Sequence, residues 1–302
     1  MNDTTASVRH MLSKAPAATA QAITSHCLVC GGPYQSSPLQ GLVTCARCGF
    51  VSTDVELADS ELEALYGKGY FHGEEYLNYV EEEESLRQNF RERLKTLRRV
   101  APDLRERDLF EIGCAFGFFL DEVKEMVKST AGIDISDDAV RYAHNVLGVN
   151  AQRGDYLKID LGRKFDLITM WDTIEHLKRP DLFLAKVRDD LRPNGLLAIT
   201  TGDIGSLNAR LRGRKWRMIH PPTHLHYFSL QTMRALLHRF GFETVHISHP
   251  GISRNLRAIL YYVLVWRTKK TKLYDAINTW RLFDMRISVN FFDIMYVIAR
   301  RS

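Results

Sequence analysis

The sequence contains no apolar stretch long enough to cross a membrane. Its longest apolar run is AILYYVLVW at residues 258–266, whereas a membrane-spanning helix needs about 20 such residues. The first 22 residues are rich in Ala, Ser and Thr and lack the apolar core of a secretory signal. We therefore expect a cytoplasmic protein without a transmembrane segment, and a poorly ordered leader at residues 1–22.

Two common nucleotide-binding motifs are also missing. The P-loop pattern G-x-x-x-x-G-K does not occur. The dinucleotide fingerprint G-x-G-x-x-G begins at Gly113 but has Ala115 at its second glycine position and Phe118 at its third. A large side chain at the third position crowds the helix against the strand, so a dinucleotide site is disfavoured.

The charge imbalance is small. The formal net charge of +5 falls well short of a dedicated nucleic-acid binder, but it suits anionic substrates such as phosphates or nucleotide sugars. A basic surface without a ligand explains it equally well. The 302 residues allow one large domain and one or two small ones.

Cysteine is scarce, but four of the five cysteines form one pattern. Cys27 and Cys30 make one C-x-x-C pair, and Cys45 and Cys48 make a second. Two such pairs place four thiolates around one Zn²⁺ at about 2.3 Å, and a cytoplasmic setting disfavours disulfides. We predict a zinc ribbon at residues 23–52 whose structural metal stabilises the segment. An iron–sulfur or redox role is the alternative, and Cys114 is expected to be inert.

Residues 53–107 are expected to form a helical connector. A helix start is predicted at residues 58–61, and a long charged helix at 81–100, with glutamates first and arginines last as the helix dipole favours. Between them lies an aromatic cluster made of Tyr70, Phe71, Tyr76 and Tyr79. These rings either pack in the core or form a lid over a ligand.

From residue 108, short apolar runs alternate with helical stretches. We predict strands at 109–113, 131–135, 149–151, 165–171, 195–201, 242–248 and 291–299, and helices at 118–127, 137–147, 181–191 and 229–240. This alternation predicts an α/β fold with a Rossmann-like, doubly wound and mostly parallel sheet. We assign residues 108–302 to it, with insertions near 203–228 and 251–289.

Ligands of such sheets bind beyond the carboxyl ends of the strands. The first strand ends in the turn Glu111-Ile-Gly113-Cys-Ala-Phe-Gly117, in which glycines allow a ligand to come close. Asp134 ends the second strand, where a carboxylate can accept both hydrogens of a ribose diol. Asp155 follows the third strand, in a position to accept from an adenine amine.

This constellation resembles the class I S-adenosylmethionine-dependent methyltransferases, over residues 108–248 and the last strand. That family has an acidic-x-Gly-x-Gly-x-Gly turn, acids after the second and third strands, and a functional loop after the fourth, here Met170 to Leu177. The resemblance implies S-adenosylmethionine as cofactor, bound by Glu111, Gly113, Ala115, Gly117, Asp134, Asp155 and Trp171. Ala115 departs from the usual middle glycine. With four cysteines in front, the chain looks like the zinc-binding branch that methylates sugars and natural products.

Methyl transfer to a hydroxyl or carbon acid needs a base, and histidine titrates near the working pH. His176 follows the fourth strand, and His224 and His226 follow the fifth together with His220. We predict that at least one of His176, His224 and His226 is catalytic, the alternative being structural hydrogen bonding. Asp172 and Glu175 are expected to contact substrate or cofactor, or to cap a helix. We do not expect these histidines to form a second metal site.

Two basic stretches allow further classes of methyl acceptor to be considered. One contains Arg210, Arg212, Arg214, Lys215 and Arg217, and the other flanks the run at 258–266. They form a solvated face, bind phosphate on the substrate, or contact an anionic membrane that carries a lipid-linked acceptor. We favour a small-molecule O- or C-methyltransferase. The alternatives are a zinc-ribbon RNA methyltransferase and a non-catalytic binding protein, and the sequence leaves the oligomeric state open.

Overall fold

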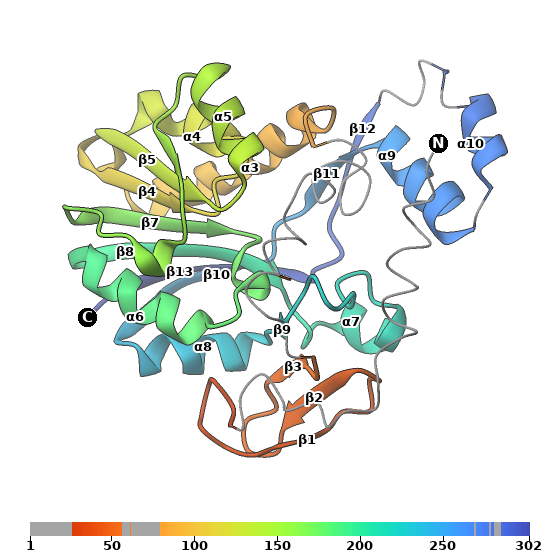
Figure 1. The fold of residues 1–302 in the computed structure, drawn as a ribbon, viewed down its shortest axis with the longest axis horizontal. Coiled ribbons are helices and arrows are strands. Elements are labelled where there is room, and N and C mark those ends of the chain that lie inside the picture. The colour runs from red at the N-terminus through yellow and green to blue at the C-terminus, as the bar shows by residue number, and fades with distance from the viewer. Residues whose placement is uncertain (1–25, 56–60, 62–78, 269, 278, 281–284) are drawn as a thin grey trace.

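A computed structural model of the chain describes residues 26–55, 61, 79–268, 270–277, 279–280 and 285–302 (Figure 1). The expected leader at 1–22 lies outside the described residues. So do the expected helix start, apart from Glu61, and the aromatic residues Tyr70, Phe71 and Tyr76.

A seven-stranded sheet in the order β10-β13-β8-β7-β4-β5-β6 forms the centre of the fold. Its strands are β4 (Asp108–Ile112), β5 (Ser129–Asp134), β6 (Ala151–Arg153), β7 (Phe165–Trp171), β8 (Leu191–Gly202), β10 (Phe242–Ser248) and β13 (Ile294–Arg301). Strands β4 to β8 pair in parallel, and β13 is antiparallel to both β8 and β10. The predicted Rossmann-like, mostly parallel sheet is therefore confirmed.

Helices cover both faces of this sheet (Figure 1). One face packs against α3 (Glu83–Val100), α4 (Phe118–Val123) and α5 (Asp137–Asn145) through buried residues such as Phe90, Phe119 and Ala143. The other packs against α6 (Pro180–Asp190) and α8 (Leu230–Arg239) through Leu184 and Leu236. The α4 helix is shorter than predicted, because residues 124–126 continue it as a 3-10 turn. Further 3-10 turns lie at 104–106, 156–158, 174–176 and 213–215.

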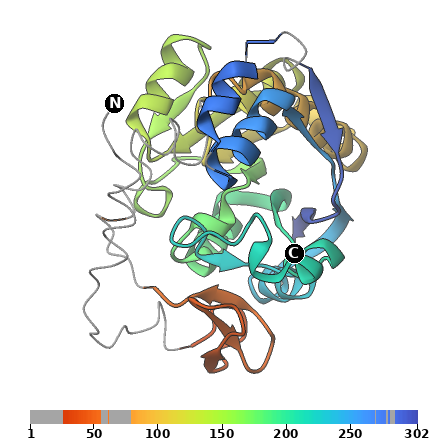
Figure 2. The same cartoon turned by 90° about the vertical axis from the view of Figure 1, so that its right-hand side faces the viewer.

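A second sheet joins the cysteine segment to the middle of the chain. Its order is β1-β2-β3-β9, made of β1 (Tyr34–Ser36), β2 (Leu42–Cys45), β3 (Val51–Thr53) and β9 (His226–Tyr227). Val51 pairs with Tyr227 and Ser52 with His226. Figures 1 and 2 show this small sheet on one side of the main domain, next to α7 (Leu207–Arg212).

The segment before the last strand packs against α3. It contains β11 (Ile252–Asn255), α9 (Leu256–Tyr261), a π-helical turn (Tyr262–Arg267), α10 (Thr271–Ile277) and β12 (Arg286–Val289). Asn89 of α3 exchanges two hydrogen bonds with the backbone of Ser253, and Arg254 pairs with Glu82 at 2.7 Å. Across the described residues, no helix has both the length and the apolar character needed to span a bilayer.

Candidate functional site

The turn after β4 depends on two glycines. Gly113 has φ +75°, and a Cβ there would lie 2.7 Å from Oγ1 of Thr173 in the loop after β7. Gly117 has φ +79° and forms the N-cap of α4, and a Cβ there would lie 2.8 Å from that of Ala143. A side chain at either position would be strained and would clash. The turn therefore fits tightly between β5, α5 and the loop after β7.

Ala115 occupies the middle of this turn in a left-handed conformation, with φ +44°. Such a conformation costs a non-glycine residue about 1–2 kcal/mol. Its N–H donates to Oδ2 of Asp134 at 2.8 Å. The missing glycine is therefore accommodated by strain, and the turn is held by the carboxylate at the end of β5.

Three carboxylates lie along this edge of the sheet. Asp134 also accepts from the Ser136 N–H at 2.9 Å, and burial raises its pKa. Glu111 is 2% exposed, has one oxygen without a hydrogen-bond partner, and has a pKa raised well above its ordinary value by burial and by Asp134. Asp155 caps the 3-10 turn at 156–158 and pairs with Lys158 at 3.1 Å. Asp134 is thus satisfied by backbone donors on both oxygens, Glu111 is buried with one oxygen unpartnered, and Asp155 is partly solvated.

Arg93 of α3 reaches the same edge, and no sequence motif predicts this contact. Its guanidinium donates to Asp172 at 2.6 Å and lies 5.4 Å from the ring centre of Trp171. Trp171 is buried, packs edge-on against Phe119, and has an Nε1 without a hydrogen-bond partner. The burial of Arg93 could not be predicted from the sequence, because α3 carries many charged residues and most arginines on such a helix face water.

Glu175, His176 and His224 meet beyond the ends of β7 and β8. One potential ligand atom from each lies within 4.8 Å of the other two. The Glu175 carbonyl accepts from the Leu225 N–H at 2.8 Å, which joins the two loops. The rings of His176 and His224 are 4.6 Å apart, edge to face. The structure thus brings together two of the three histidines predicted from the sequence.

Burial controls the protonation of this cluster. It lowers the pKa of His176 to about 4 and that of His224 well below its ordinary value. Burial and the nearby charge of Asp172 raise the pKa of Glu175 to about 8. Neither Glu175 oxygen has a hydrogen-bond partner among the described residues. Both imidazoles are therefore neutral at neutral pH, and they face a carboxyl group that is poorly satisfied.

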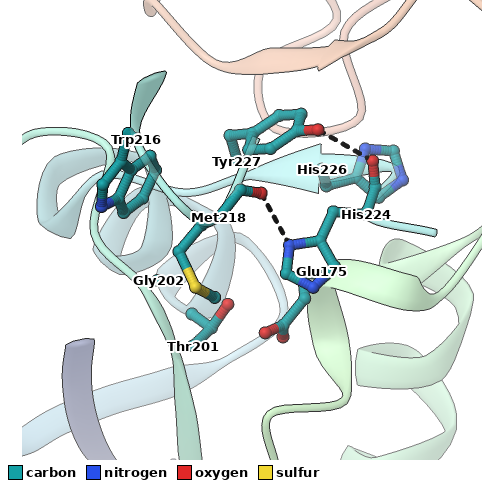
Figure 3. Close-up of a pocket in the computed structure, with 8 residues that line it drawn as sticks. All are labelled: Glu175, Thr201, Gly202, Trp216, Met218, His224, His226 and Tyr227. Carbon is teal, nitrogen blue, oxygen red and sulfur yellow. Dashed lines mark hydrogen bonds between the residues drawn. The ribbon is translucent and has the colours of Figure 1, made fainter. Parts of the chain in front are cut away.

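The cluster borders a narrow crevice (Figure 3). Its lining consists of Glu175, Thr201, Gly202, Trp216, Met218, His224, His226 and Tyr227. Figure 3 shows the His224 ring next to the Glu175 carboxylate. The backbone carbonyl of Met218 accepts a hydrogen bond from the His224 ring.

His226 borders the crevice but is directed elsewhere. Its Nδ1 lies 3.0 Å from Oγ of Ser52 on β3, and its ring stacks on Phe50. It is 1% exposed, and burial lowers its pKa to about 4. These contacts place His226 at the joint between the cysteine segment and β9.

The four paired cysteines converge on one point. Cys27 and Cys48 have sulfurs 3.6 Å apart, and those of Cys30 and Cys45 are 3.5 Å apart. Tetrahedral Zn–S bonds of about 2.3 Å require sulfurs about 3.8 Å apart. Burial alone would raise the pKa of Cys45, but backbone hydrogen bonds from Cys48 and Arg47 bring it down to about 7. The donor set and spacing fit a four-thiolate zinc site.

The family model and the curated relatives that match this chain are all described as methyltransferases. Residues 84–247, more than half of the chain, match the family described as a methyltransferase domain. The ubiquinone biosynthesis O-methyltransferase of Chelativorans sp. (strain BNC1) is 29% identical over 100 residues, which are 31% of this chain and 39% of that protein. Its namesake from Azorhizobium caulinodans is 24% identical over 99 residues, with the same coverage. The match thus spans about two fifths of these relatives.

The fold itself has solved counterparts. The structure of magnesium protoporphyrin IX methyltransferase from Synechocystis PCC 6803, with bound SAH, matches with a TM-score of 0.52 at 13% identity. The match covers 81% of this chain and all of that one (100%). At this identity the likeness establishes the fold.

Proposed function

Because this chain belongs to the methyltransferase-domain family and is a class I S-adenosylmethionine-dependent methyltransferase, we propose that it methylates a hydroxyl or carbon of a small molecule. The observation that carries the proposal is the buried Glu175–His176–His224 cluster beside the glycine turn. Thr173 packs against Gly113, so the polar cluster and the turn belong to one site.

The residues at the sheet edge suit the cofactor. Asp134 is proposed to hold the ribose diol, and Asp155 the adenine amine, with Glu111, Gly113, Ala115, Gly117 and Trp171 forming the rest of the pocket. The unpartnered oxygen of Glu111 and the unpartnered Nε1 of Trp171 are buried polar atoms that a polar ligand would satisfy. S-adenosylmethionine supplies a methyl group activated on a sulfonium. The chain aligns the acceptor with it and excludes water, which contributes about 7–11 kcal/mol.

The acceptor is proposed to bind with its nucleophilic atom at the histidine pair. His176 and His224 orient the acceptor hydroxyl and draw its proton away. His226, whose Nδ1 faces Ser52, is proposed to support the site from the small sheet. O-methylation is also what the curated relatives are named for.

The four-thiolate site is proposed to hold structural zinc. Four protein ligands leave no coordination position for a substrate, so this metal stabilises and does not react. Cys27 and Cys45 belong to the same core as Leu28, Phe50 and Phe228. A metal bound by these cysteines would therefore also stabilise the part of the main domain that packs against them.

A lipid-linked or natural-product acceptor, which could be phosphorylated, is favoured by the surface near α7. Leu207 and Leu211 lie one turn apart and are 73% and 78% exposed. Residues 210–215 include the exposed Arg210, Arg212, Arg214 and Lys215 and no acid. Asn208 donates to Asp293 at 2.7 Å, which brings α7 next to the exposed Phe292. Exposed apolar side chains among basic ones are typical of contact with anionic lipid.

Product identification tests the proposal. The protein is incubated with methyl-labelled S-adenosylmethionine and separate fractions of sugars, lipid extracts and RNA, and the labelled product is identified. Label in a small-molecule or lipid fraction, lost in His224→Ala, is the expected result. Label only in RNA would support the zinc-ribbon RNA methyltransferase instead, and label in no fraction would contradict catalysis on these classes.

A further inference from the structure

The Glu175 carboxyl group is not explained by the fold. It is 2% exposed, and neither oxygen has a hydrogen-bond partner among the described residues. An unpaired buried polar group costs about 1–3 kcal/mol, and a charged one more. Glu111 has a similar environment, but it has a single unpartnered oxygen. These two oxygens lie beside the His224 ring and the Thr201 hydroxyl (Figure 3) and keep lone pairs that a bound ligand would satisfy.

The two histidines are held in the tautomer that binds metal. His176 Nδ1 donates to the Thr223 carbonyl at 2.8 Å, and His224 Nδ1 donates to the Met218 carbonyl at 2.8 Å. A carbonyl can only accept, so each Nδ1 carries the proton and each Nε2 carries a lone pair. Metal-binding histidines are oriented in this way, with the second ring nitrogen bonded to a backbone carbonyl or a carboxylate.

The separation of the three groups fits one small cation. Their ligand atoms lie within 4.8 Å of one another, whereas two ligands of one tetrahedral zinc ion, at about 2.0–2.2 Å, lie about 3.4 Å apart. Side-chain movements of about 1 Å close this difference. His220 lies behind the cluster, with its ring 3.9 Å from that of His224 and its Nδ1 on Thr223 Oγ1 at 2.6 Å.

We propose that Glu175, His176 and His224 bind a divalent transition-metal ion, with Zn²⁺ as the first choice. Two imidazoles and one carboxylate are a donor set of such ions, whereas Mg²⁺ and Ca²⁺ prefer oxygen alone. Three protein ligands leave a position open, in contrast to the four-thiolate site. This proposal departs from the sequence-based expectation that these histidines form no metal site, because Glu175 and His176 are 48 residues or more from His224 in the chain and only the fold brings the three together.

The open position deepens the proposed function, on which this step rests. A hydroxyl oxygen of the acceptor that takes this position loses its proton more easily, because the cation stabilises the alkoxide. With the ion bound, the two histidines act as its ligands in place of the direct proton acceptance proposed above, and water carries the acceptor's proton away. An acceptor with an oxygen next to the methylated hydroxyl would chelate the ion when its coordination expands from four to five, which selects for vicinal oxygen pairs.

Metal content per chain tests the site without relying on activity. The parent protein and the variants Glu175→Gln and His224→Ala are purified in the same way, and the zinc content of each is measured by mass spectrometry. Each variant should lose one equivalent relative to the parent, whatever the four-thiolate site contains. Glu111→Gln, which changes an equally buried glutamate at the cofactor turn, should retain the parent value.

A second measurement uses Co²⁺ as a probe. The parent protein loaded with two equivalents of Co²⁺ should show ligand-field absorption from a nitrogen and oxygen site besides the thiolate-to-metal charge transfer of the four-thiolate site, and Glu175→Gln should remove the first and keep the second. Glu175→Gln keeps the shape of the side chain, so the variant is expected to fold. Circular dichroism checks its folding, and calorimetry checks that it still binds S-adenosylhomocysteine. Unchanged zinc content in folded Glu175→Gln and His224→Ala would overturn the site even if the protein methylates. Loss of one equivalent in protein that methylates nothing would uphold the site and contradict the function.

Discussion

Arg93 and Asp172 form a hydrogen-bonded ion pair of 2.6 Å that joins α3 to the loop after β7. Asp172 has φ +50°, an uncommon conformation for a residue with a side chain. It also accepts from Oγ1 of Thr200 at 2.9 Å. The pair therefore fixes the start of the loop that carries Glu175 and His176.

Arg93→Met should destabilise the protein by about 2 kcal/mol, because it leaves Asp172 without its cation in a partly buried site. The pKa of Asp172, which burial tends to raise, is held below its ordinary value by the charge of Arg93. Urea unfolding measures the change. The double variant Arg93→Met with Asp172→Asn should recover part of the loss, and a double variant no more stable than Arg93→Met would contradict the role of the pair.

Asp134→Ala should weaken binding of S-adenosylhomocysteine by about 10-fold or more. A hydrogen bond to a charged group contributes about 1.5–3 kcal/mol, and the proposed ribose contact uses this carboxylate. Isothermal titration calorimetry gives the Kd. Asp137→Ala, at the exposed start of α5, is the control and should bind as the parent does. Equal affinity of Asp134→Ala and the parent would remove Asp134 from the site.

Removal of metal from the cysteine segment should destabilise the whole chain. The Cys27 and Cys45 side chains lie in the main core, and β3 pairs with β9. A strong chelator or Cys45→Ser should therefore lower the melting temperature, with loss of one zinc per chain. Cys114→Ser is the control, because Cys114 is buried outside the four-cysteine cluster and its replacement should leave the zinc content unchanged. A melting temperature insensitive to Cys45→Ser would show that the metal is dispensable for folding.

The stability of the cofactor-free protein should fall with rising pH because of Glu111. Its pKa is raised in the folded state above the ordinary 4.5, so the folded protein holds this proton more tightly than the unfolded chain. Stability is then fully present below about pH 4.5 and declines as pH rises towards the folded pKa, by up to about 1.4 kcal/mol per pH unit. The charges that face Glu111 are Asp134, which strengthens this effect, and Arg93, which opposes it.

Glu111→Gln should flatten this decline and stabilise the protein at neutral pH, as measured by urea unfolding over a pH series. Glu125→Gln changes an exposed glutamate on the same side of the fold and should leave the profile unaltered. Parallel profiles for the parent and Glu111→Gln would show that Glu111 is ionised without penalty.

Leu207→Ser with Leu211→Ser should reduce binding to vesicles that contain phosphatidylglycerol. The substitutions remove two exposed apolar side chains from a basic surface, and added salt should weaken the remaining attraction. Vesicle flotation measures the bound fraction. Val146→Ser, which changes an exposed apolar residue directly after α5, is the control. Absence of parent binding to anionic vesicles would leave the α7 surface without a lipid role.

Long, periodic elements were predictable from the sequence, and contacts between distant segments were not. The predicted strand at 165–171 coincides with β7, which is largely apolar and buried, and that at 242–248 with β10, in which aromatic and β-branched residues favour a strand. β9 has two residues and is a strand only because β3 lies beside it. Predictions of short strands fail where pairing is set by tertiary contacts.

The same limit applies to the candidate site. The turn from Glu111 to Gly117 and the position of Asp134 follow local rules, and the structure places them at one sheet edge as expected. The meeting of Glu175 with His224 depends on how two loops fold over each other. The burial of Arg93 depends on Trp171 and Asp172, which are almost 80 residues away in sequence.

The pairing of Ser52 with His226 has a consequence for engineering. An exchange of residues 26–55 with those of a related enzyme would also replace the neighbour of the segment that presents His224. Such a chimera needs residues 224–228 from the same donor, because His224, His226 and Tyr227 line the crevice beside Glu175 and would otherwise not match the exchanged segment. We therefore expect the acceptor preference of such a chimera to be that of the donor enzyme when residues 26–55 and 224–228 are exchanged together.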